Sequence, residues 1–144
     1  MKIAPSLVCV ALACLLASVV HADAPELQAE LVCQKVPGPG RVLCELTSHV
    51  AGARLVWSDA LVVRAPSFAR PLRSRVLAEL GGAAAPGVAR AKLALVASAV
   101  GQGKLEVLAR GVVCRGGSAG ESCSTRTVTV TALVSAGDAA LPAP

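Results

Sequence analysis

The sequence contains no tyrosine and no asparagine, and its aromatic side chains are limited to Trp57 and Phe68. Without asparagine there is no Asn-x-Ser/Thr acceptor, so N-glycosylation is excluded. Proteins that bind single-stranded nucleic acid usually stack the bases on aromatic side chains, so the shortage of aromatics argues against a nucleic-acid partner. It argues against a sugar-stacking site for the same reason.

The motifs of common catalytic and metal sites are also missing. Gly-x-Ser-x-Gly spacing occurs once, at residues 116–120, but in a loop rich in Gly and Ser with no predicted helix after it, so it does not predict a nucleophile elbow. After residue 22 the chain has no Cys-x-x-Cys dithiol and none of the close cysteine spacings of structural zinc sites. After residue 22 the only histidine is His49, and its place among polar side chains predicts a surface residue rather than part of a catalytic triad. We therefore expect no catalytic residue, no metal and no cofactor, and a small secreted hydrolase is a remote alternative.

The amino-terminal segment predicts export. Lys2 is followed by an apolar run from Leu7 to Val20 and by the small-residue ending at Ala22, which is the pattern of a signal peptide cleaved after that alanine. Acylation of Cys14, which would give a lipoprotein, is a weaker alternative. No later stretch approaches the roughly 20 apolar residues of a membrane-spanning helix. We expect a secreted or periplasmic chain with no transmembrane segment.

The remainder has the size of one domain and a modest positive charge. Cleavage after Ala22 leaves 144 − 22 = 122 residues, a usual length for a single domain. It removes only Lys2 from the 14 basic side chains and none of the 9 acidic ones, so the net charge becomes 13 − 9 = +4. We expect the domain over residues 23–136, followed by a flexible tail at residues 137–144.

Alternating side chains predict an all-β fold. In residues 26–36 one face carries apolar side chains and the other carries polar ones, which is the period of a half-buried strand. The turn residues Pro37-Gly38-Pro39-Gly40 follow, and residues 41–50 alternate again, which predicts a hairpin. Residues 91–100 and 104–110 alternate around Gly101-Gln102-Gly103, which predicts a second hairpin.

The rest of the chain extends this pattern less evenly. In residues 124–134 threonines alternate with valine and alanine, residues 54–57 and 60–64 are strand-like, and residues 75–80 suit either a strand or one helical turn. With no convincing long helix, these segments predict an antiparallel β-sandwich of about seven strands, Ig-like in general architecture. Among Leu55 and Val56, Trp57 is expected in the core.

Four cysteines remain after the leader, which in an exported chain predicts two disulfides. Cys33 and Cys44 occupy mirror positions about the Pro-Gly turn, and opposed residues of an antiparallel pair lie within disulfide reach. The alternation places this pair inward and places Cys114 and Cys123 outward, so each local pair shares a face. We expect Cys33–Cys44 and Cys114–Cys123 as structural cross-strand disulfides, with free or metal-bound thiols as a minor alternative.

The spacing of Cys44, Trp57 and Cys114 resembles that of the sheet-bridging cysteines and core tryptophan of immunoglobulin domains. The resemblance implies an alternative disulfide between Cys44 and Cys114. The chain departs from the family pattern at Val112, where those domains carry a tyrosine. The two cysteines would share a face only if Gly111 marked a bulge.

One basic segment suggests a binding function. Arg64, Arg70, Arg73 and Arg75 lie in a stretch without acidic residues, and guanidinium groups suit phosphate and carboxylate. They are a possible anion-binding site for an envelope polymer. The excess of ten arginines over four lysines, which a GC-rich genome would produce, reduces the weight of this interpretation.

Taken with the missing catalytic motifs, these features favour an exported non-enzymatic domain that binds an unknown protein or envelope component, or that serves as a structural part of the bacterial envelope or secretome. The anion-binding module is the alternative. A protease inhibitor presenting Arg115 from the loop between Cys114 and Cys123 is a remote one.

Overall fold

Nine antiparallel strands and one short 3₁₀ turn make up the fold of the parts that the computed structural model describes, residues 25–117 and 120–137. The predicted signal peptide, Cys14 and nearly all of the predicted tail lie outside these residues. The strands are β1 (Gln28–Cys33), β2 (Gly40–His49), β3 (Arg54–Arg64), β4 (Ala69–Pro71), β5 (Arg75–Leu77), β6 (Glu79–Gly81), β7 (Ala85–Ala97), β8 (Gly101–Gly117) and β9 (Gly120–Ala136), and the turn η1 covers Gly82–Ala84. No helix in the described ranges is long and apolar enough to cross a membrane.

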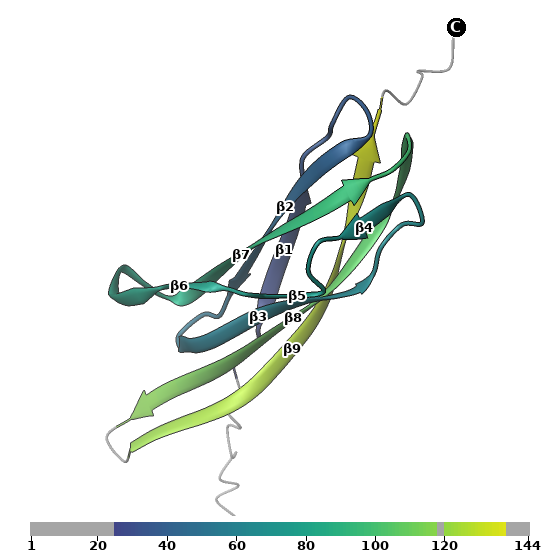
Figure 1. Ribbon diagram of the computed structural model, residues 1–144. Coiled ribbons are helices and arrows are strands. Elements are labelled where there is room, and N and C mark those ends of the chain that lie inside the picture. Colours follow the sequence, from purple (N-terminus) through teal and green to yellow (C-terminus); the bar gives the residue numbers. More distant parts are fainter. Residues whose placement is uncertain (1–24, 118–119, 138–144) are drawn as a thin grey trace, which may run out of the picture.

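The strands form two sheets that face each other (Figure 1). Sheet A has the order β1-β2-β7-β4, with β6 also paired to β7, and sheet B has the order β5-β3-β8-β9. Between them lies a core whose largest buried side chains include Leu46, Leu93 and Leu95 from sheet A and Leu105 and Val107 from sheet B. The predicted all-β sandwich is confirmed, with nine strands in place of about seven.

The first predicted hairpin is confirmed. β1 and β2 pair antiparallel with Leu31 opposite Leu46 and Cys33 opposite Cys44. Leu31, Val42, Cys44 and Leu46 are buried in the core, as the alternation predicts. In the Pro-Gly turn Gly40 has a φ of 140°, a backbone angle that residues with a Cβ rarely adopt. The alternation and the turn residues therefore predicted both the register of β1 with β2 and the face that each strand turns to the core.

The second predicted hairpin is wrong. β7 belongs to sheet A and β8 to sheet B, so the connection at residues 98–100 crosses between the sheets. Gly101 and Gly103 lie inside β8, where a Cβ would come within 2.8 Å of the Phe68 ring and 2.5 Å of Pro66. Because these glycines have no side chain, Pro66 and Phe68, which precede β4, can pack directly on β8. The alternating pattern around the same glycines had predicted a hairpin turn.

Two irregularities in β3 decide which of its side chains reach the core. The register with β8 shifts between Leu55 and Trp57 and again between Val62 and Arg64, so Val56 and Val63 are extra residues on β3. A β-bulge of this kind reverses the alternation of faces beyond it. Leu55 is consequently buried, whereas Trp57 is half-buried on the outer face. The expectation of Trp57 in the core is wrong for this reason.

Both predicted disulfides are present, and the immunoglobulin-type alternative is excluded. Cys33–Cys44 and Cys114–Cys123 have Cα–Cα distances of 4.0 and 4.1 Å, as expected of residues directly opposite in an antiparallel pair. Cys114 and Cys123 lie on the outer face of sheet B, on the same side as Arg110 and Thr125, as expected, although Cys114 is only 2% exposed. It lies opposite Arg54, whose ion pair with Glu121 covers this end of the disulfide.

The hairpin of β8 and β9 extends well beyond the rest of sheet B (Figure 1). In the segment expected as a loop, residues 115–117 and 120–122 continue the pairing, with Arg115 opposite Ser122 and Gly116 opposite Glu121. β3 begins at Arg54, opposite Cys114, so this end of the hairpin consists of two strands only. The Cys114–Cys123 disulfide thus joins β8 to β9 at the position where β3 begins to pair with β8.

Candidate functional site

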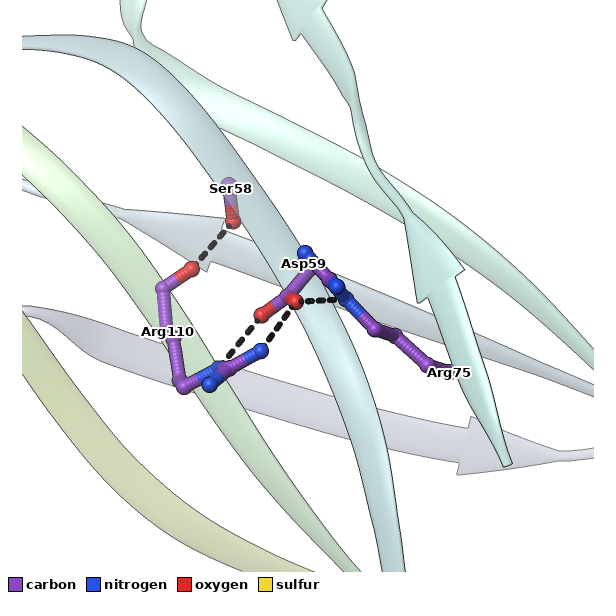
Figure 2. A network of polar contacts seen from close by, with 4 residues as sticks. All are labelled: Ser58, Asp59, Arg75 and Arg110. Atoms are coloured by element: carbon purple, nitrogen blue, oxygen red, sulfur yellow. Dashed lines mark hydrogen bonds and ion pairs between the residues drawn. The ribbon is translucent and has the colours of Figure 1, made fainter.

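The most elaborate polar cluster among the described residues lies on the outer face of sheet B (Figure 2). Register places Asp59 of β3 directly opposite Arg110 of β8, while β5 brings Arg75 alongside. Arg110 donates from Nε to Oδ1 of Asp59 at 2.8 Å and from Nη2 to Oδ2 at 2.5 Å, and Arg75 Nε donates to Oδ2 at 2.6 Å. Beside them, Ser58 Oγ donates to the carbonyl oxygen of Arg110 at 2.9 Å.

The two arginines keep the Asp59 carboxylate charged. Its side chain has no exposed surface, and this burial acts to raise its pKa. The hydrogen bonds and positive charge of Arg110 and Arg75 outweigh burial and leave the pKa below the ordinary 3.8. In return, the hydrogen bond to Asp59 raises the pKa of Arg110. A carboxylate whose oxygens both accept hydrogen bonds from arginines, and whose pKa is lowered, is a weak general base near neutral pH.

Trp57 completes the cluster. The guanidinium carbons of Arg110 and Arg75 lie 5.7 and 5.8 Å from the centre of the indole ring, within the range of cation–π attraction. Asp59 therefore holds two arginines in fixed positions, and both guanidinium groups lie over the tryptophan ring. We call Trp57, Asp59, Arg75 and Arg110 the Trp57 cluster.

Aliphatic and threonine side chains surround the Trp57 cluster on the same face. Leu61 and Leu108 are half-buried opposite each other, Val112 lies opposite Trp57, and Leu77 of β5 is 64% exposed opposite Asp59. Along β9 the outward positions are the exposed threonines Thr125, Thr127, Thr129 and Thr131. This face therefore has aromatic and aliphatic side chains at its centre, two arginines held beside them, and a row of threonine hydroxyls along β9.

The structure does not bring the four arginines of the predicted anion site together. Arg64 and Arg75 belong to sheet B, Arg70 lies in β4 of sheet A, and Arg73 lies in the connection between β4 and β5. Arg75 is committed to Asp59. Anion binding by the whole segment stays a prediction.

The other sequence candidates have simple surroundings. His49 is exposed on β2, opposite Gln28, and Arg115 is exposed in β8. Ligand atoms of Cys114, Glu121 and Cys123 lie within 4.8 Å of one another, a spacing suited to a metal ion. Both sulfurs belong to the disulfide, so they offer no thiolate to a metal.

Sequence reasoning missed Asp59 and Arg110 as partners, since they lie 51 residues apart. A signal was nevertheless present, because an aspartate inside an apolar strand needs a cation or hydrogen-bond donors beside it. In comparisons with known proteins, no family model and no curated protein matches this chain. Its function is therefore argued from the faces of the two sheets.

Proposed function

We propose that the chain is an exported, non-enzymatic domain that binds a partner protein through the outer face of sheet B. The observation that carries the proposal is the Trp57 cluster, in which Asp59 fixes Arg75 and Arg110, and the guanidinium groups of both lie over the indole ring of Trp57. Tryptophan and arginine are the side chains most enriched among those that dominate protein–protein binding energy. The all-β scaffold and its two disulfides suit a rigid binding module.

The way the cluster is held supports binding rather than chemistry. Two arginines against one aspartate leave one net positive charge beside an apolar centre. Side chains that are ordered before binding lose less conformational entropy when a partner arrives. A fitting partner presents a carboxylate next to aliphatic or aromatic side chains, so that the carboxylate meets a guanidinium while the apolar groups cover Trp57 and Leu77.

We expect Trp57→Ala to weaken capture of the partner about 30-fold, the effect of removing a side chain that contributes about 2 kcal/mol to binding. Chains from residue 23 onward, wild type and variant, are immobilised and exposed to envelope and culture-medium extracts of the source cell, and the retained protein is identified and titrated. Val100→Ala, which removes an aliphatic side chain at 60% exposure in the connection between the sheets, outside this face, is the matched control.

Equal capture by wild type and Trp57→Ala would show that this face is not the binding surface. Turnover of a substrate by the wild-type domain in a broad hydrolase panel would contradict the non-enzymatic role. A partner lost with Trp57→Ala and kept with Val100→Ala agrees with the proposal.

A further inference from the structure

The outer face of sheet A carries a second, chemically different surface. Strand register defines it row by row across β2, β7 and β4 (Figure 1). In one row Val96 lies between Arg41 and Arg70. In the next, Leu43 lies opposite Ala94, whose carbonyl oxygen accepts a hydrogen bond from the backbone N–H of Leu72.

Large aliphatic side chains of this surface are exposed to solvent. Val96 is 42% exposed, Leu43 40% and Leu72 58%, and Val32 of β1 adds a fourth at 58%. They come from four adjacent segments, so at the usual strand spacing the patch is about 14 Å across. Contiguous exposed apolar surface in a folded domain marks a binding surface more often than single exposed side chains do.

Positive charge borders the aliphatic patch. Arg41 and Arg70 flank Val96, and Arg73 follows Leu72 in the chain; all three arginines are exposed. Within residues 25–117 and 120–137 none of the three forms an ion pair. One acidic side chain, Glu45, borders the patch, opposite both Val32 and Lys92. The patch therefore joins aliphatic side chains to arginines whose charge is not neutralised.

We propose that this face of sheet A docks on an anionic lipid surface, with Arg41, Arg70 and Arg73 contacting headgroup phosphates and Val32, Leu43, Leu72 and Val96 entering the boundary between headgroups and acyl chains. Arginine forks match phosphate oxygens. Interfacial binding needs buried aliphatic area together with cations and does not need a shaped pocket.

The composition of the patch separates it from the Trp57 cluster. A protein interface is enriched in aromatic side chains, methionine and arginine. The sheet B face has tryptophan and arginine, whereas the sheet A patch has arginines without an aromatic side chain or methionine, and Glu45 lies at its border. An acidic protein could bind the same arginines, but the patch has no aromatic side chain of the kind that usually dominates binding energy in protein interfaces. The lipid surface is the occupant that the residues favour.

The test uses the chain from residue 23 onward. All strands and both disulfides lie within residues 25–137, and omitting the leader removes the apolar run from Leu7 to Val20, which would itself enter lipid. Binding is measured by co-sedimentation with vesicles of phosphatidylcholine alone and of phosphatidylcholine mixed equally with phosphatidylglycerol. We expect binding to the mixed vesicles only, and weaker binding as salt is added.

Two variants locate the surface. Because one basic side chain near an anionic membrane is worth about a fivefold change in affinity, Arg41→Gln/Arg70→Gln/Arg73→Gln is expected to weaken binding about 100-fold. The control Arg64→Gln/Arg90→Gln/Arg115→Gln removes the same charge from exposed sites outside the patch and is expected to have a much smaller effect. Leu72→Ser should weaken binding severalfold, since its side chain would leave the lipid boundary.

Several outcomes would overturn the proposal. Equal losses for the two triple variants would mean that net charge alone drives adsorption. Unchanged binding with Leu72→Ser, or full competition by soluble glycerol phosphate, would indicate a site for free phosphate. Absence of vesicle binding together with patch-dependent capture of an acidic protein would assign the surface to a protein. None of these results depends on Trp57, so failure here is distinguishable from failure of the partner-binding proposal.

Discussion

Replacing Asp59 with alanine is expected to lower the free energy of unfolding by about 2 kcal/mol. The change leaves Arg75 and Arg110 side by side without the anion that holds them, and it removes hydrogen bonds to a charged group, each worth about 1.5 to 3 kcal/mol. The expected loss is below that of a deep buried ion pair, about 3 to 5 kcal/mol. The carboxylate is covered by the arginine side chains themselves, and Arg75 stays 53% exposed to screening solvent.

The measurement is urea denaturation of wild type, Asp59→Ala and a control. Glu106→Gln is suitable because Glu106 is half-buried on the same outer face of sheet B and forms no ion pair in the described structure. We expect it to change stability by less than about 0.5 kcal/mol. If Asp59→Ala lowered the free energy of unfolding no more than this control does, the ion pairs of Asp59 would contribute no more to stability than an exposed ion pair.

The pH dependence provides a sharper test with Asp59→Asn. The pKa of Asp59 is lower in the folded chain than in the unfolded chain, where it is near 3.8. Its stabilisation is therefore fully present above that value and is lost as pH falls through the folded pKa. The stability difference between wild type and Asp59→Asn should be constant near neutral pH and should shrink below about pH 4. A difference that stays constant or grows on acidification would contradict the lowered pKa.

The sequence predicted those features that local pattern determines. Cys33 and Cys44 stand symmetrically about a turn, so their pairing needed only the rule that opposed residues of a hairpin lie close together. The inward face of β1 and β2 followed from period-two alternation. Even so, β4 was missed, and residues 75–80, left open between a strand and a helical turn, form parts of the two short strands β5 and β6. Alternation has no meaning over three residues.

Long-range pairing was beyond local pattern. Glycines between two alternating segments indicate that the chain changes direction, but the partners of β7 and β8 are decided by which sheets those strands join. Likewise, one extra residue at Val56 turns Trp57 and Asp59 outward. The Trp57 cluster depends on that bulge and on contacts to β5 and β8, so no reading of residues 54–64 alone could assemble it.

The two disulfides are expected to differ in effect although their loops are similar. They join cysteines 11 and 9 residues apart, for which the chain-entropy model gives about 2.5 to 3 kcal/mol each. Cys44 is buried within the main core cluster, beside Leu31 and Val42. We expect Cys33→Ala/Cys44→Ala to lower the free energy of unfolding by about 3 kcal/mol, measured by urea denaturation without reductant.

For Cys114→Ala/Cys123→Ala we expect a smaller global loss and a local opening. Residues beyond this disulfide form a two-stranded end without support from β3, so the end can fray while the sandwich stays folded. Without the disulfide, the unfolded chain gains conformational entropy, which destabilises the fold. The frayed end of the native chain gains part of the same entropy, so the net loss in the free energy of unfolding is smaller. Amide hydrogen exchange should accelerate in residues 112–125 and remain slow in β2 and β7. Equal global losses for both variants, without local acceleration, would show that the hairpin end is held by its strand pairing and by the Arg54–Glu121 ion pair rather than by the disulfide.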